Sequence, residues 1–248
     1  MSRKEKLTTQ ENPAVRTLIW KSDKATMVYY DKELKENVEI NLPFKFAVLE
    51  KDYVSFNGYS ESLNEGIWSN EVKNKEDVVT VKAGKNILKQ FKKEEWKDVK
   101  DNPDLKGCNY TQILYIAAQL DGDDEEKIYR IMLNKASFGG GITTDKKTGK
   151  EHQGQENDGW IRFINKLSKG KPNAIYDNYI LITGSKTKKN GAVTYTLAEF
   201  DSEPIPESQI DKYNEMASVV EEYFKYYNNK PKEDIAVEEY VMQDDTDL

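Results

Sequence analysis

The sequence predicts a mainly β protein: an elaborated, closed or nearly closed β-barrel with one short internal helix, one C-terminal helix and a disordered acidic tail. About nine short segments rich in aromatic and β-branched residues are separated by turn residues, which is typical of a barrel. Apolar residues at helical spacing predict the two helices. Residues 233–248 contain seven acids and no base, and a block of like charge cannot fold alone.

The first half of the chain reads as a succession of strands. The expected strands are residues 15–21, 25–30, 37–42, 44–56, 67–72 and 78–82. The polar connection between the second and the third predicts a hairpin, and Pro43 interrupts the chain before the fourth. Residues 85–99 have helix-like apolar spacing with many lysines, and Pro103 and Gly107 end this segment.

Two hairpins are expected in the second half. Residues 110–120, the most apolar segment of the chain, should pair with residues 127–133 across Asp121-Gly122, because Asp-Gly between apolar runs is a strong hairpin signal. Residues 176–183 and 192–200 should form the second hairpin, with residues 184–191 as its lysine-bearing tip.

Two helices complete the expected elements. Residues 157–168 read as a short amphipathic helix that Asn157 or Asp158 could cap. Residues 207–228 follow a stiff, proline-containing linker and have apolar residues spaced by threes and fours, which predicts a long helix.

These elements form one expected domain, residues 13–230, between a disordered N-terminus (residues 1–12) and the acidic tail (residues 231–248). No run of 18 apolar residues exists, which predicts no transmembrane helix, and the polar N-terminus predicts no signal peptide. The one cysteine, Cys108, excludes an intramolecular disulfide and fits a reducing cytosol. We therefore expect a cytoplasmic protein that does not contact membranes.

Motifs for catalysis and metal binding are weak. The one histidine, His152, and Cys108 cannot form a standard zinc site. The glycines at 139–141 and 149 lack the spacing of a phosphate-binding loop, and the acidic turn at 121–126 lacks the glycine and glutamate of a calcium loop. We expect no catalytic residue, no metal and no cofactor.

One short motif keeps an enzymatic alternative open. Glu71-Val72-Lys73 has the Glu-x-Lys shape that metal-dependent nucleases use, and Asp52 could be the upstream acid that shares the metal. A motif of three residues has little specificity, so a magnesium-dependent nuclease is the second alternative.

Aromatic residues are unusually frequent, with 15 Tyr, 8 Phe and 4 Trp. Rings on a strand surface can stack on unpaired bases, and adjacent lysines can hold phosphates. The candidate DNA-binding residues are Trp20, Lys21, Tyr30, Lys45, Tyr59, Trp68, Lys73, Lys82, Lys85, Lys89, Lys186, Lys188 and Lys189. The rival interpretation is that many rings are core residues. Because neighbouring strand residues face opposite ways, only one of Tyr29 and Tyr30 can face outward.

The whole formal charge of −7 resides in the tail, since residues 1–232 hold 37 acids and 37 bases. A tethered polyanion can compete with a polyanionic ligand or recruit a partner by its tip. The candidate partner-binding residues are Asp244, Asp245, Asp247 and Leu248.

An aromatic and basic β-barrel followed by an acidic tail is similar to the replicative single-stranded DNA-binding proteins of bacteria and phages. The run PFKFAVLEKDYVSFNGYSESLNEGIWSNEV (residues 43–72) and the arrangement WIRFINKL…YILITGSKTKKNGAVTYTLAEF (residues 160–200) resemble those of tailed phages, the crAss-like group in particular. The resemblance covers most of residues 14–227. It implies an OB-fold barrel, no enzymatic activity, and a place in the cytoplasm of an infected bacterium. It also implies replication partners such as a polymerase, helicase or primase. The tail departs from the bacterial pattern, because Leu248 stands alone where those proteins typically end in Pro and Phe.

The sequence therefore predicts a sequence-nonspecific single-stranded DNA-binding protein of phage DNA replication and recombination. The first alternative is a phage structural or assembly protein whose barrel is an interaction module, because Tyr is also enriched at protein interfaces. The sequence leaves open whether the chain forms a homo-oligomer.

Overall fold

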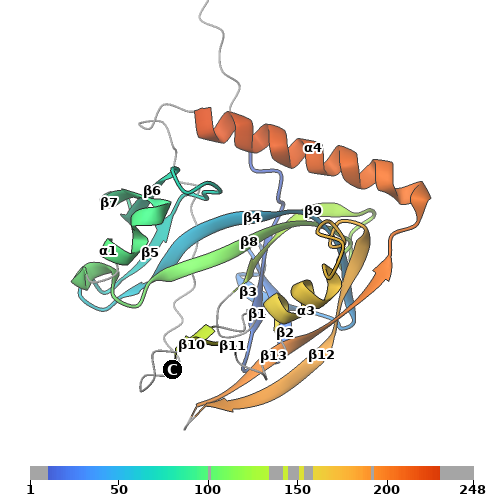
Figure 1. The fold of residues 1–248 in the computed structure, drawn as a ribbon, viewed down its shortest axis with the longest axis horizontal. Coiled ribbons are helices and arrows are strands. Elements are labelled where there is room, and N and C mark those ends of the chain that lie inside the picture. Colours follow the sequence, from blue (N-terminus) through green and yellow to red (C-terminus); the bar gives the residue numbers. More distant parts are fainter. Residues whose placement is uncertain are drawn as a thin grey trace, which may run out of the picture.

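Figure 1 shows the fold in a computed structural model, which describes residues 11–99, 102–133, 142–144, 151–153, 159–190 and 193–229. The acidic tail and the first ten residues lie outside these ranges, so the expectations for them stay predictions.

The described chain is mainly β, as expected. Its strands are β1 (Thr17–Lys21), β2 (Thr26–Asp31), β3 (Glu36–Ile40), β4 (Phe44–Ser60), β5 (Glu65–Ser69), β6 (Val78–Ala83), β7 (Asn86–Lys92), β8 (Asn109–Ala118), β9 (Lys127–Leu133), β10 (Ile142–Thr144), β11 (Glu151–Gln153), β12 (Asn178–Asn190) and β13 (Val193–Pro204). Its helices are η1 (Lys93–Glu95), α1 (Trp96–Val99), η2 (Pro103–Leu105), α3 (Trp160–Leu167) and α4 (Glu207–Asn229). None of the described helices is long and apolar enough to cross a membrane.

Eleven strands form one large mixed sheet. Its order is β3-β2-β1-β9-β8-β4-β5-β6-β7, and β4 also pairs with β12, which pairs with β13. The pair β1–β9 is parallel and the neighbouring pairs are antiparallel. The 17-residue strand β4 joins the parts of the sheet, because its beginning pairs with β12, its middle with β8 and its end with β5.

The strand β4 changes neighbours at Gly58. Asn57 is the last of its residues that pairs with β8, opposite Asn109, and Gly58 is the first that pairs with β5, opposite Ile67. A Cβ atom on Gly58 would lie 2.7 Å from the Cα of Cys108, so a residue with a side chain would push the two segments apart. Cys108 is buried here, and burial raises the pKa of its thiol to about 11, which fits a packing residue.

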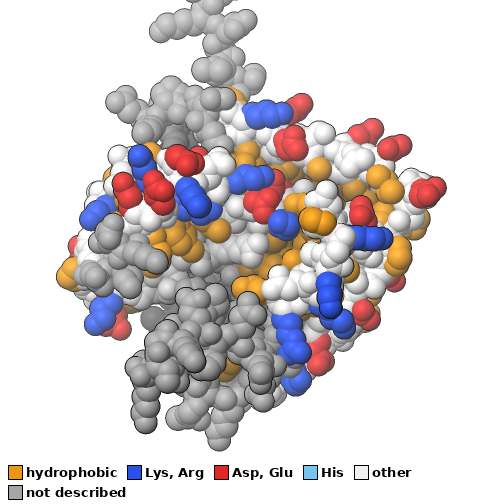
Figure 2. Space-filling model, viewed as in Figure 1, with side chains coloured by type: hydrophobic (Ala, Val, Ile, Leu, Met, Phe, Trp, Pro, Cys, Tyr) orange, Lys and Arg blue, Asp and Glu red, His pale blue; other side chains and the backbone are white. Residues whose placement is uncertain are grey.

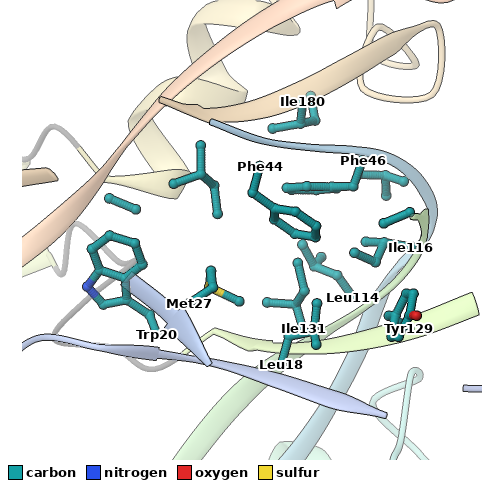
Figure 3. Packing of buried hydrophobic residues seen from close by; sticks show 14 of the residues in the cluster. Leu18, Trp20, Met27, Phe44, Phe46, Leu114, Ile116, Tyr129, Ile131 and Ile180 are labelled. Atoms are coloured by element: carbon teal, nitrogen blue, oxygen red, sulfur yellow. The ribbon is translucent and has the colours of Figure 1, made fainter. Parts of the chain in front are cut away.

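Three apolar clusters hold the layers together. The largest lies inside the curl of the main sheet and contains Trp20, Phe46 and Ile131, which come from segments far apart in the sequence (Figure 3), and α3 packs against it from the side of β13. The second lies on the opposite face of β4 and β8 and is covered by α4. The third lies on one face of β5–β7 and includes Val99 of α1 and Leu105 of η2.

The expected closed or nearly closed barrel is not formed, because the main sheet stays open in the described part of the chain. Both edges of β1 are occupied, one by β2 and one by β9, so β13 cannot pair with it. Instead, β13 meets the end of β1 through side chains. The Trp20 Nε1 donates to the Thr196 carbonyl oxygen at 3.2 Å, and the Thr196 hydroxyl donates to the Ser22 carbonyl oxygen at 2.6 Å.

The three expected hairpins are confirmed as β2–β3, β8–β9 and β12–β13. The last is longer than expected, because β12 continues to Asn190 through most of the segment predicted as its tip. Both expected helices are confirmed as α3 and α4. The α3 helix begins after Gly159, and the proposed caps Asn157 and Asp158 lie outside the described residues.

The helix-like spacing over residues 85–99 was misleading, because most of this segment is the strand β7. A two-residue turn joins Ala83 to Asn86, and its first residue, Gly84, has a φ of +52°, which suits a tight hairpin. Backbone pairing with β6 therefore decides the structure of this segment. Of the apolar residues on β7, only Phe91 is buried.

Candidate nucleic-acid interface

The strand register places an aromatic and cationic row on one face of β4–β7. Trp68 on β5 lies directly opposite Lys82 on β6, and Lys82 lies opposite Ile87 on β7. Tyr59 on β4 is opposite Gly66, two residues before Trp68, so it shares this face. We call the side chains of Tyr59, Trp68, Lys82 and Ile87 the Trp68 row.

Two members of the Trp68 row are open to solvent. The exposed fraction is 44% for Tyr59 and 55% for Ile87. The Tyr59 hydroxyl donates to Asn64 Oδ1 at 2.6 Å, which fixes the direction of the ring. An exposed ring in a fixed orientation offers a surface on which a base can stack.

Lys82 is the unusual member of the row, because only 8% of it is exposed. Its Nζ lies 5.3 Å from the centroid of the Trp68 ring, within the range of a cation–π interaction. No carboxylate of the described part of the chain forms an ion pair with it. Lysine is rarely buried without an acidic partner. The Trp68 row therefore holds a positive charge that the described part of the fold does not neutralise.

Polar side chains next to this row fix the register of its strands. Asn70, just after β5, donates from Nδ2 to the Val78 carbonyl oxygen at 2.9 Å, and its Oδ1 accepts from the Thr80 amide at 2.7 Å. The Gln90 side chain donates to the Thr80 hydroxyl at 3.0 Å across β6 and β7. These bonds join the three strands that carry Trp68, Lys82 and Ile87.

The same face of the sheet continues under α4, where it is buried. Arg130 on β9 and Tyr115 on β8 are cross-strand neighbours, and both hold Glu71. Arg130 Nη1 donates to Glu71 Oε1 at 2.6 Å, and the Tyr115 hydroxyl donates to Glu71 Oε2 at 3.0 Å. Burial, and then the charge of Glu71, raise the pKa of Tyr115, so its hydroxyl stays protonated and donates. The Phe224 ring of α4 packs on Tyr115 with 5.3 Å between the ring centroids.

Both charged residues of the Glu-x-Lys motif, Glu71 and Lys73, bind other side chains of the protein. Glu71 is buried between Arg130 and Tyr115, while the Lys73 Nζ lies 2.8 Å from Glu50 Oε2 and 3.8 Å from Asp52 Oδ2. Both carboxylate oxygens of Glu71 already accept a hydrogen bond within the protein. Within the described ranges, no group of three His, Cys, Asp or Glu side chains could hold a metal ion. The geometry therefore gives the nuclease alternative no support.

Five of the predicted DNA-binding residues gather in the β4–β7 part of the sheet. Tyr59, Trp68 and Lys82 belong to the Trp68 row, Lys85 lies exposed in the β6–β7 turn, and Lys89 lies exposed on β7. Ten of the thirteen predicted residues lie between positions 20 and 89 of the sequence, and the strand pairing brings these five together.

Other predicted residues lie apart from this group. Trp20 is 2% exposed and belongs to the main core, so its ring is not accessible to a base in this structure. Lys21 and Tyr30 are half-buried on β1 and β2. Tyr29, the neighbour of Tyr30, packs toward the main core, as strand alternation requires.

The remaining lysines belong to other surroundings. Lys45 lies over the Tyr179 ring at 4.8 Å and pairs with Glu203 at 3.3 Å, and Lys73 is paired as described above. Lys186 is exposed on β12. The side chains of Lys188 and Lys189 lie outside the described residues, as do Asp244, Asp245, Asp247 and Leu248.

Sequence reasoning missed Ile87, because its segment was read as a helix. The signal that could have found it is Gly84-Lys85 between two β-prone runs, a pattern typical of a two-residue hairpin. With that hairpin, Lys82 and Ile87 become cross-strand neighbours.

Comparisons with known proteins do not identify this chain: no family model, no curated protein and no solved structure matches it.

Proposed function

We propose that the protein binds single-stranded DNA without sequence preference and that the Trp68 row is its base-stacking surface. The observation that carries this proposal is the buried Lys82, whose ammonium lies over Trp68 without a carboxylate partner in the described part of the chain. A DNA phosphate is an anion that could neutralise it, and the bases next to that phosphate would meet the rings of Trp68 and Tyr59.

The chemistry of the row favours single strands over duplex. Stacking requires bases whose faces are free, and every base has such a face, so binding of this kind tolerates any sequence. Further along the same face, the Thr111 hydroxyl donates a hydrogen bond to Asn57 Oδ1 at 2.8 Å. A role in phage replication and recombination and recruitment of partners by the acidic tail remain predictions from the sequence.

The first experiment measures the affinity for fluorescein-labelled oligo-dT at several salt concentrations without magnesium. We expect salt-sensitive binding by the full chain. The variant Trp68→Leu should weaken it by about 5- to 150-fold, which corresponds to about 1–3 kcal/mol for one stacked base.

The charge is tested separately with Lys82→Met. Loss of one phosphate contact on a single strand should reduce the slope of log K against log salt by about 0.7. The matched control is Lys225→Met on α4, a lysine whose side chain is 73% exposed, and it should leave the slope unchanged. If the full chain does not bind oligo-dT at low salt, the proposal is wrong and an interaction module becomes the better interpretation. Binding that Trp68→Leu does not change would move the site elsewhere.

A further inference from the structure

The positive charge of this chain is concentrated in one segment. Residues 159–190 contain seven bases and one acid, Asp177, which is a net charge of +6. Residues 1–232 as a whole are neutral, so those of them that lie outside this segment carry a net charge of −6. A part of the chain with no net charge thus contains a strongly basic segment.

The α3 helix directs its bases outward. Its apolar side packs on β13, because the rings of Trp160 and Phe163 lie 5.3 Å and 5.5 Å from the Phe200 ring. Arg162 and Lys166 lie on the other side of the helix and are exposed.

The turn after α3 adds two further bases. Lys169 and Lys171 are both exposed, and the Lys171 amide donates to the Ser168 carbonyl oxygen at 3.0 Å, which keeps the turn compact. The turn is tied to the beginning of β12 by Asn178, whose side chain donates to the Ala174 carbonyl oxygen at 2.7 Å. Lys186 is exposed further along β12. We call the exposed bases Arg162, Lys166, Lys169, Lys171 and Lys186 the α3 basic surface.

Three of these bases are not neutralised by the described part of the fold. Lys166, Lys169 and Lys171 form no ion pair there, whereas Lys45 and Lys127 each bind a carboxylate. Figure 2 shows Lys and Arg side chains gathered over the region where α3 and the β12–β13 hairpin lie in Figure 1. Like charges held close together repel one another, and an external polyanion would remove that repulsion.

We infer that the α3 basic surface binds the phosphate backbone of single-stranded nucleic acid as a second contact, separate from the Trp68 row. This inference rests on the proposed function. The two contacts differ in chemistry: the Trp68 row stacks on bases, and the α3 basic surface holds phosphates, chiefly through Lys166, Lys169 and Lys171, which no described carboxylate pairs with. The second contact should therefore depend on salt and on oligonucleotide length, and not on base identity.

The test is the variant Lys166→Gln/Lys169→Gln/Lys171→Gln in the full chain. We expect the slope of log K against log salt for a long oligo-dT to fall by about 2, because about 0.7 is lost for each of three phosphate contacts. An oligonucleotide too short to reach both contacts should bind the variant and the wild type equally. The matched control, Lys32→Gln/Lys75→Gln/Lys225→Gln, changes the net charge equally and should leave the slope unchanged. Equal thermal melting curves establish that both variants fold.

The outcomes separate this inference from the proposed function. If Trp68→Leu weakens binding while the α3 variant keeps the wild-type slope, the inference is overturned and the proposed function stands. If the full chain binds no oligo-dT, both are overturned. Heparin then serves as a probe, and retention lost only in the α3 variant would assign the surface to another polyanion.

Discussion

Arg130 and Lys82 are two cations buried on the same face of one continuous sheet, and the fold treats them differently. Arg130 is 3% exposed and its charge is met by Glu71 within the protein. Lys82 is 8% exposed and lies over the Trp68 ring, with no ion pair in the described part of the chain. The charge of Arg130 is balanced by Glu71 within the protein. The charge of Lys82 has no carboxylate partner in the described part of the chain, as a site for an external anion requires.

The largest expected effect comes from breaking the pair of Arg130 and Glu71. Glu71→Ala should lower the free energy of unfolding by about 3–5 kcal/mol, because Arg130 would remain buried without its counterion. Urea unfolding measures this loss. In contrast, Lys82→Met should change stability by less than about 1 kcal/mol, because the substitution leaves no charge without its partner.

A double variant separates loss of the partner from loss of the pair. Glu71→Leu/Arg130→Met should recover part of the loss caused by Glu71→Ala, because no unpaired charge stays buried, and should remain about 1–3 kcal/mol below wild type, because the buried Tyr115 hydroxyl loses its acceptor. If Lys82→Met destabilises the protein as much as Glu71→Ala, the two cations do not differ and the comparison fails.

A smaller effect on stability is expected when a tyrosine hydroxyl is removed from the α4-covered part of the sheet or from the Trp68 row. The Tyr213 hydroxyl on α4 lies 2.9 Å from that of Tyr179 and donates to Glu126 Oε1 at 2.9 Å, so Tyr213→Phe removes the partner of the buried Tyr179 hydroxyl, while Glu126 keeps its ion pair with Lys212. We expect a loss of about 1–3 kcal/mol in thermal or urea unfolding. Tyr59→Phe removes only an exposed hydroxyl bond and should cost less than about 0.5 kcal/mol. Equal losses would show that the α4-covered part is no more tightly bonded than the Trp68 row.

The smallest expected effect is a change in stability with pH that arises from Asp123, a carboxylate whose charge is balanced within the protein. Asp123, in the β8–β9 turn, accepts bonds from Lys127, Tyr129 and the Leu120 amide. Burial opposes ionisation, but these bonds outweigh it and keep the pKa of Asp123 below its usual range. Its contribution to stability is therefore present above about pH 4 and is lost as the pH falls through the lowered folded-state pKa.

The measurement for Asp123 is the urea midpoint at a series of pH values from 7 to about 2. Asp123→Asn should be less stable than wild type at pH 7, and its midpoint should fall less on acidification. Asp124→Asn, an exposed neighbour in the same turn, is the control. A variant curve parallel to wild type would contradict the assignment.

The sequence was most informative where a local signal and the tertiary structure agree. Asp121-Gly122 predicted the β8–β9 hairpin, and the apolar spacing of residues 207–228 predicted α4 almost to the residue. These features depend on turn chemistry and helical periodicity, which a short window of sequence contains.

Features that depend on distant neighbours could not be predicted. Trp20 was expected to face DNA, but it is buried because β12, β13 and α3 pack around the main core. The open sheet follows from β9 occupying the second edge of β1, a parallel pairing between residues more than 100 positions apart in the chain. The Trp68 row required the registers of three hairpins at once, although three of its four members had been named from composition alone.

Gly58 has a consequence for the evolution of this chain. It is the point at which β4 stops pairing with β8 and begins to pair with β5, and a methyl group there would meet the backbone of Cys108. Other residues of β4 can be substituted if their neighbours change as well. At Gly58 the contact is with the backbone of Cys108, so no change in a neighbouring side chain can make room for a larger residue. In relatives of this protein we expect glycine at this position even where the Trp68 row has diverged.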